Sequence, residues 1–278
     1  MNQAPRQKKQ LPAHMQKLLN QNNASDSAGV PWEGRELDEL NFQNDQGFRD
    51  ENYAKVRQEF TDGKGDEVEV YNAIASSRVL IPLEAYVGDE AEGAAGLTAD
   101  KSADMAMIFI QAPDGRKTLP VFTDVNMMKK WNKEARPVPV EAGRAALAGA
   151  GEEAQMMVID PGEHDMWLVR RPAMWAMAQG KGWVPAYENP QVKEIFDSSI
   201  LNFPDIRAVE LAPAATVEEL REGKLGVVEL RVTIHVKPGL SQQQLQELVQ
   251  NIQTAWAHHP LLTEYVDSME MKVVTAGF

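Results

Sequence analysis

Apolar and polar residues along the first third of the chain repeat with the periods of short helices and a strand. Between Phe48 and Phe60 the apolar residues have helical spacing, and Asp62-Gly63 is a typical helix end. A second helix is expected from Asp66 to Ala75, with its apolar positions on one face. The run from Arg78 to Leu83 is almost continuously apolar, which indicates a strand buried on both faces.

The stretch from Met105 to Trp175 has the densest pattern, and it predicts two hairpins. In the first, residues 106–111 and 118–122 flank Pro113-Asp114-Gly115. Proline presets φ in such a turn and glycine supplies a positive φ. In the second, residues 155–159 and 166–169 flank Pro161-Gly162.

Three helices and an edge strand are predicted around these hairpins. Thr123 or Asp124 caps a helix that includes Trp131. The segment 136–140 (RPVPV) cannot be helical, because each proline forces its predecessor into an extended conformation, so we expect an edge strand. Small residues over 142–150 predict a closely packed helix, and another helix starts at Pro172 and ends at Gly180.

After Asn189-Pro190 the pattern begins again and predicts a smaller module. A helix over 192–201 precedes strands over 206–211 and 227–236, the second of which alternates cleanly. Ser241 and Gln244 form a capping box for the following helix, and 266–274 is the last strand.

Taken together, these elements predict an α+β fold in two mixed α/β-layered domains. The 278 residues are long for one domain and ordinary for two. We expect a disordered tail over 1–30, rich in Gln, Asn, Lys and Ser. An N-terminal domain over 31–189 would hold a larger mixed sheet with helices, and a C-terminal domain over 190–278 would be a strand–strand–helix–strand module.

Charge and composition exclude several classes of function. A net charge of −13 repels phosphate backbones, so nucleic-acid binding is not expected. The chain has no cysteine, which excludes disulfides, thiolate nucleophiles and cysteine-based metal sites. No secretory signal is visible, and the apolar run 105–110 is far shorter than the roughly 20 residues a membrane span needs. We expect a cytoplasmic protein without a membrane partner.

No motif specifies a reaction, a metal or a cofactor. The GxGxxA sequence at 149–154 follows a helix and precedes a strand, which is the reverse of the order in a dinucleotide site. The histidines are not arranged in metal-binding or catalytic spacings. We therefore expect no metal, no cofactor and no enzymatic activity.

Candidate binding residues are the tryptophans and arginines of the central block, because these residue types anchor interfaces. The Arg pair at 170–171, beside a helix start, could also hold a carboxylate or phosphate. The simpler interpretation is that the tryptophans are core residues and the arginines pair with this chain's own acids. The set is Trp131, Arg136, Arg144, Arg170, Arg171 and Trp175, with Trp183 just beyond it.

The central residues resemble the SseB family, named for enhanced serine sensitivity. The similar run is TLPVFTD, KKW, ARPVPVEAGRAALA, EEAQMMVIDPG and VRRPAMWAMAQGKGWVP. The resemblance extends from about Ile74 to the end, with the part after Asn189 similar to the family's C-terminal domain by its order of elements. It implies a two-part α+β fold in the bacterial cytoplasm, and it brings no active site to carry over.

The first functional hypothesis is a non-catalytic binding or regulatory protein that acts through protein–protein contacts. Its partner would be another protein or a second copy, with the strands around 138–140 and 227–236 as candidate pairing sites. The alternative is a sensor of an amino acid or another small carboxylate, held by Arg144, Arg170 or Arg171. A third hypothesis, less favoured, is a hydrolase with an unrecognised Asp/His site.

Overall fold

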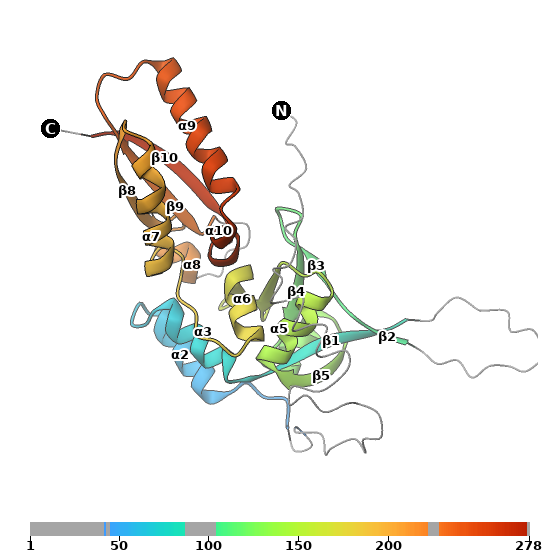
Figure 1. Cartoon of the computed structure of the whole chain (residues 1–278). Coiled ribbons are helices and arrows are strands. Elements are labelled where there is room, and N and C mark those ends of the chain that lie inside the picture. Colours follow the sequence, from blue (N-terminus) through green and yellow to red (C-terminus); the bar gives the residue numbers. More distant parts are fainter. Residues whose placement is uncertain (1–41, 43–44, 87–103, 222–227, 277–278) are drawn as a thin grey trace, which may run out of the picture. The chain divides into compact units, whose positions relative to one another are not determined.

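The computed structural model describes residues 42, 45–86, 104–221 and 228–276, which form two compact units (Figure 1). The N-terminal unit contains the described residues up to Gly182, together with Leu220 and Arg221. The C-terminal unit contains the others from Trp183 onward. The domain boundary expected at residue 189 stays a prediction, and the expected tail over 1–30 lies outside the described residues.

The N-terminal unit begins with two capped helices. Helix α2 (Glu51–Thr61) starts where the Asp50 carboxylate accepts a hydrogen bond from the amide of Tyr53, at 2.8 Å. It ends at Asp62, and Gly63 follows with φ of 79°, the left-handed conformation that glycine adopts without strain. Helix α3 (Glu67–Ala75) is fixed by a reciprocal capping box between Asp66 and Glu69. The sequence predicted both helices and both ends.

Two sheets follow, and one isolated bridge between Leu80 and Phe122 joins them. The antiparallel sheet has the order β2–β1–β5, and the mixed sheet has the order β3–β4–β6–β7. Their strands are β1 (Arg78–Tyr86), β2 (Asp104–Met107), β3 (Ile110–Gln111), β4 (Lys117–Val121), β5 (Arg136–Glu141), β6 (Met156–Ile159) and β7 (Trp167–Val169). Three helices complete the unit: α4 (Val125–Trp131), α5 (Ala142–Gly151) and α6 (Arg171–Ala178).

The first predicted hairpin has a different form in the structure. Its turn is correct, since Gly115 has φ of 85° and donates to the carbonyl of Ala112 at 2.8 Å. Its first arm, expected over 106–111, is wrong as one strand, because the chain changes sheets there. The first part pairs with β1 as β2, Ile108 donates to the carbonyl of Pro82, and the last two residues pair with β4 as β3.

Strand β4 runs parallel to β6, which is the decisive feature of the mixed sheet. The two strands are linked through α4, β5 and α5, and both are almost entirely buried, as expected for a parallel pair covered on both faces. Small residues let α5 approach closely: a Cβ added at Gly149 would lie 3.0 Å from the Leu119 side chain, and one at Gly143 would lie 3.0 Å from the carbonyl oxygen of Met177 in α6.

The C-terminal unit is a three-stranded sheet, of order β10–β9–β8, with helices packed against it (Figure 1). Strand β9 (Leu230–Val236) is central, antiparallel to β8 (Ile206–Pro213) and parallel to β10 (Met269–Thr275). The helical segments are α7 (Pro190–Ser199), η1 (Ile200–Asn202), α9 (Gln242–Ala257) and α10 (Pro260–Tyr265), and the short helix α8 (Val217–Arg221) begins in this unit and ends in the other. The capping box at Ser241 and Gln244 is present, whereas α10 had no counterpart in the sequence prediction.

One apolar core holds this unit together. Alternate residues of β9 are buried, which confirms the predicted alternation. They pack with Val192 and Phe196 of α7 and with Ile252 and Trp256 of α9. The Phe196 and Trp256 rings meet edge to face, with centroids 4.8 Å apart.

The structure confirms the predicted α+β class, with mixed and antiparallel sheets beside helices. In the part of the chain that the structure describes, no helix has the length and apolarity to cross a membrane.

Candidate functional site

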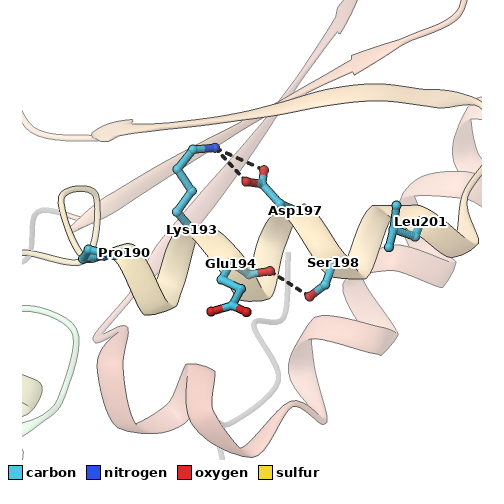
Figure 2. Close-up of a pocket in the computed structure, with 6 residues that line it drawn as sticks. All are labelled: Pro190, Lys193, Glu194, Asp197, Ser198 and Leu201. Carbon is cyan, nitrogen blue, oxygen red and sulfur yellow. Dashed lines mark hydrogen bonds and ion pairs between the residues drawn. The ribbon is translucent and has the colours of Figure 1, made fainter.

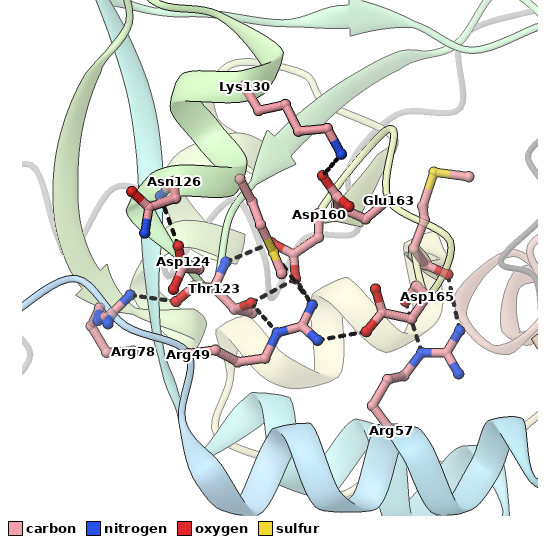
Figure 3. Close-up of polar contacts among 12 residues, drawn as sticks. Arg49, Arg57, Arg78, Thr123, Asp124, Asn126, Lys130, Asp160, Glu163 and Asp165 are labelled. Atoms are coloured by element: carbon pink, nitrogen blue, oxygen red, sulfur yellow. Dashed lines mark hydrogen bonds and ion pairs between the residues drawn. The ribbon is translucent and has the colours of Figure 1, made fainter.

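The most concentrated polar cluster lies where β4 and β6 end, at the same edge of the mixed sheet (Figure 3). Thr123 comes two residues after β4, and Asp160 directly follows β6. Both Asp160 oxygens are used: one accepts from the Thr123 amide at 2.7 Å, and the other accepts from the Thr123 hydroxyl at 2.6 Å. Asp160 is fully buried and has φ of 49°, a conformation that Asp tolerates better than most residues.

Arg49 completes this cluster from the segment that precedes α2. Its guanidinium donates to Asp160 at 2.6 Å, to Asp165 at 2.5 Å and to the Thr123 hydroxyl at 2.8 Å. The contacts are charge-assisted and mostly shielded from water, since the Arg49 side chain is 17% exposed and that of Asp160 is 1% exposed. We call Arg49, Thr123, Asp160 and Asp165 the arginine network.

Two further arginines tie the surrounding backbone together. Arg57, wholly buried in α2, donates to the carbonyls of Asp165 and Met166, at 2.9 and 3.1 Å. Arg78, at the start of β1, donates to the carbonyl of Thr123 at 2.9 Å and forms an ion pair with Asp45 at 2.8 Å. The segment 45–50 is therefore anchored to both loops that leave the parallel strand pair.

The electrostatics of the network follow from its burial. Burial raises the pKa of Asp160 above the usual value for a carboxyl, and the hydrogen bonds from Thr123 and the Arg49 charge act in the opposite direction. For Asp165 burial also favours the protonated form, but the hydrogen bond and charge of Arg49 outweigh it, so its pKa lies below the usual value. The hydrogen bonds among these residues tie the segment before α2 to the loops that follow β4 and β6.

The residues expected to bind a partner do not form one site. Arg170 and Arg171 are buried, 7% and 3% exposed, and the Arg171 guanidinium lies 5.4 Å from the ring centroid of Trp175. Trp175 is itself 4% exposed, and all three residues are part of the interior around α6. Arg144, in contrast, has a 62% exposed side chain near Glu141 at the start of α5.

Trp131 and Arg136 belong to one largely exposed segment of the N-terminal unit, residues 129–136. Trp131, at the end of α4, is half-buried and rests against Phe122 with ring centroids 5.2 Å apart. Arg136, at the start of β5, is exposed. Between and beside them are the exposed side chains of Lys129, Lys130 and Lys133. We call these three lysines, Trp131 and Arg136 the basic face.

The basic face is directly connected to the arginine network (Figure 3). Lys130 forms an ion pair at 2.8 Å with Glu163, in the loop that contains Asp160 and Asp165. Phe122, which supports Trp131, precedes Thr123 in the chain. The buried network thus fixes the two loops on which the basic face rests.

A shallow hollow of about 510 Å³ lies beside α7 in the C-terminal unit (Figure 2). Its lining residues come from one helix and the turn after it, and include the Lys193–Asp197 ion pair at 2.9 Å and Leu201, which is 81% exposed. None of the candidate residues lines it. A wall made by one helix does not enclose a small ligand.

The histidines and acids of the described chain form no cluster of three that could hold a metal ion. His164 is exposed in the loop after β6, and His235 on β9 lies 3.1 Å from the exposed Glu210 of β8. His164 belongs to the N-terminal unit and His235 to the C-terminal unit.

Sequence reasoning missed the arginine network because it treated β4 and β6 as arms of two separate hairpins. A signal was available in the positions of Thr123 and Asp160, each a polar residue just after an apolar strand. Had the two strands been paired in parallel, both residues would have been placed at one sheet edge. Arg49 gave no such signal, since it lies 111 residues before Asp160.

These features define an α+β protein with an N-terminal unit built around a parallel strand pair and its buried arginine network. Residues 54–176 match the family model for the SseB protein N-terminal domain. This region of the chain is therefore similar to the N-terminal domain of SseB proteins. Comparison with curated proteins and with solved structures gave no significant match.

The family match differs in extent from the expected resemblance. It begins at residue 54, upstream of Ile74, so that most of α2 and all of α3 belong to the matched region. It ends at residue 176, and the similarity of the last ninety or so residues to the family's C-terminal domain stays a prediction. Thr123, Asp160, Asp165 and the basic face all lie within the match, whereas Arg49 lies just before it.

Proposed function

We propose that this protein is a non-catalytic binding protein of the cytoplasm, and that its basic face binds an acidic segment of a partner protein. The supporting observation is a local reversal of charge. Residues 129–136 carry four basic residues and one acidic residue, in a chain whose net charge is −13. A partner segment rich in Asp or Glu would be attracted to this face and repelled by most of the remaining surface.

Trp131 gives this face more than charge. Tryptophan and arginine are the residue types that most often dominate binding energy, since each combines a large contact area with a polar group. Trp131 is half-buried against Phe122, so its orientation is set before a partner arrives. A pre-oriented side chain loses less conformational entropy on binding.

The arginine network contributes rigidity to the same site. It holds the loop after β6, and Lys130 reaches that loop through Glu163. The face is therefore carried by two loops whose ends are fixed by buried ion pairs. Rigid support of this kind favours specific binding.

A charge-reversal experiment tests the proposal with a matched control. The double variant K129E/R136E and the single variant R144E would be compared with the wild type in affinity purification from the source cells, with quantitative mass spectrometry. Arg144 is an exposed arginine of the same unit, outside the basic face. We expect one or more acidic partners to be retained by the wild type and R144E and lost by K129E/R136E.

Salt provides the second arm of this experiment. Contacts between exposed charges weaken as ionic strength rises, with a Debye length of about 8 Å at 0.15 M salt. Recovery of the partner should fall steadily between 50 and 500 mM salt. Equal recovery by wild type and K129E/R136E at every salt concentration would refute the basic face as the binding site.

A further inference from the structure

The longest edge strands in the described parts of the two units differ in what they offer to another strand. In β1, Leu80 lies opposite Pro139 of β5, but its backbone amide and carbonyl point the other way and bond to Phe122. Because backbone groups alternate in direction along a strand, the amides of residues 136, 138 and 140 in β5 face β1. The outward positions are thus Pro137 and Pro139, which have no N–H. Prolines at these positions are a known protection against edge pairing, so the strand around 138–140 is a poor pairing site.

The C-terminal sheet has one protected and one unprotected edge. Strand β9, the other expected pairing site, is central and has neighbours on both sides, so that expectation is wrong. Edge strand β8 has an irregular register between Ile206 and Ala208 and carries Pro213 at its end. Both features discourage addition of another strand.

Edge strand β10 has neither proline nor bulge, and its outward backbone groups can be identified. Ser268 accepts from the amide of Leu230, and Ala276 donates to the carbonyl of Val236, so even-numbered residues face β9. The amides and carbonyls of Met269, Met271 and Val273 therefore point away from the sheet. No other described strand pairs with this edge.

The charges on β10 are self-complementary. Glu270 and Lys272 are exposed on the sheet face opposite the core, where one carboxylate oxygen of Glu270 also forms an ion pair with Arg231 of β9 at 2.6 Å. Consider two copies of β10 that run antiparallel with Met271 opposite Met271. Glu270 of each copy then lies opposite Lys272 of the other, with Cβ atoms about 5 Å apart.

The same register suits the backbone. Residues 269, 271 and 273 then form hydrogen-bonded pairs, which gives about six interchain hydrogen bonds. The Glu–Lys pairs fall at the positions between them, where antiparallel side chains approach most closely. Hydrogen bonding and charge therefore select one register of one two-fold pair.

We propose that the protein forms a two-fold dimer in which the β10 edges of two copies pair antiparallel about Met271, so that two three-stranded sheets become one of six strands. Like the proposed function, the dimer assumes that this protein acts by binding other protein chains. It uses residues of the C-terminal unit alone and none of the basic face.

Charge exchange between copies tests the register. In a K272E dimer, the acidic residue at position 270 of each copy lies opposite the new acidic residue at 272 of the other copy. In an E270K dimer, both of these positions carry a basic residue instead. Each single variant should dissociate about tenfold more readily than the wild type in multi-angle light scattering over a concentration series. An equimolar mixture restores opposite charges at both positions and should recover the dimer.

A control and a fold check accompany the variants. K193E reverses another exposed lysine of the same unit and should dimerise like the wild type. Circular dichroism melting identifies any variant that has lost its fold. A monomeric wild type at 100 µM, or a mixture no more dimeric than the single variants, would overturn the proposal.

Cysteine cross-linking supplies an independent test, because the chain has no cysteine of its own. In M271C the two introduced thiols face each other with Cα atoms about 5.5 Å apart, within the range that a disulfide spans. Mild oxidation should give a covalent dimer on a non-reducing gel. T275C, four residues from the axis, should stay monomeric, and equal cross-linking of the two variants would refute this register.

Failure of the dimer and failure of the proposed function are distinguishable. Loss of the acidic partner in K129E/R136E with an intact dimer supports the basic face independently of β10. A monomer that still captures the partner through Lys129 and Arg136 refutes only the dimer.

Discussion

Both units of this protein have apolar interiors, but they differ in the use of buried charge. The N-terminal unit has a buried set of ion pairs among Arg49, Asp160 and Asp165 at the end of its parallel strands. The C-terminal unit has a continuous apolar core in which Trp256 and Phe196 meet. The edge strands of the two units differ as well. The outward positions of β5 are prolines, whereas those of β10 carry free backbone amides. Under the two proposals, the N-terminal unit binds through side chains and the C-terminal unit through backbone groups.

The largest expected effect is in the apolar core. Trp256 is 2% exposed and also donates to the Ser199 hydroxyl at 2.8 Å. Truncation in W256A should reduce the free energy of unfolding of the C-terminal unit by about 4 kcal/mol. Hydrogen exchange of the full chain would show faster exchange in peptides from 190–276 and unchanged exchange in those from 45–180. Equal loss of protection in both units would contradict two separate cores.

The next effect should be in the arginine network. R49M keeps most of the apolar stem but leaves Asp160 buried without its cation, which costs about 3 kcal/mol. Hydrogen exchange should increase in peptides around 45–60 and 160–170. R144A, which removes an exposed arginine, should change stability by less than about 0.5 kcal/mol. Equal effects of the two variants would show that Arg49 contributes no more than a surface charge.

A smaller effect is expected from Asp165, whose contribution to the free energy of unfolding depends on pH with a definite sign. Asp165 has a folded pKa below the unfolded value of about 3.9. Its contribution to stability is therefore complete above the unfolded pKa and is lost as the pH falls through the folded pKa. At pH 7, D165N should be less stable by about 1–2 kcal/mol.

The difference between wild type and D165N isolates this group from Asp160, whose pKa is shifted upward. Urea denaturation at pH 7, 5, 4 and 3 would follow that difference. It should be constant down to about pH 5 and then shrink. If the stability difference between wild type and D165N grew toward low pH, the Arg49–Asp165 interaction would not stabilise the ionised carboxylate.

The smallest effect on stability should come from opening the protected edge. P137T/P139V introduces two outward amides into β5 while leaving the hydrogen bonds to β1 in place. The free energy of unfolding should change by less than about 1 kcal/mol, but the protein should gain a tendency to associate through the N-terminal unit. Light scattering of K272E with and without these changes would detect the new contact, and no added association would refute the protective role of the prolines.

Local signals predicted most of the secondary structure. Asp50, Asp66 and Ser241 cap the helices near the expected starts, and glycine follows the ends of α2 and α6. The caps were readable because capping depends on three or four neighbouring residues. Helix α10 escaped prediction because it is only six residues long and has one fully buried side chain.

Long-range pairing was not readable in the same way. The parallel β4–β6 pair brings Thr123 to Asp160, and no local pattern distinguishes it from two hairpins. The burial of Arg170 and Arg171 was unreadable for a related reason: they stand at the start of a helix, as expected, and the fold places both inside. Burial of a charged residue depends on partners far away in the sequence.

The separation of Arg49 from Asp165, 116 residues along the chain, has a consequence for biosynthesis. Arg49 leaves the ribosome long before either carboxylate that will hold it. Until β6 and its following loop have emerged, the Arg49 guanidinium has neither carboxylate to pair with. Folding of the N-terminal unit during translation should therefore be completed in one late step, when Asp160 and Asp165 become available together.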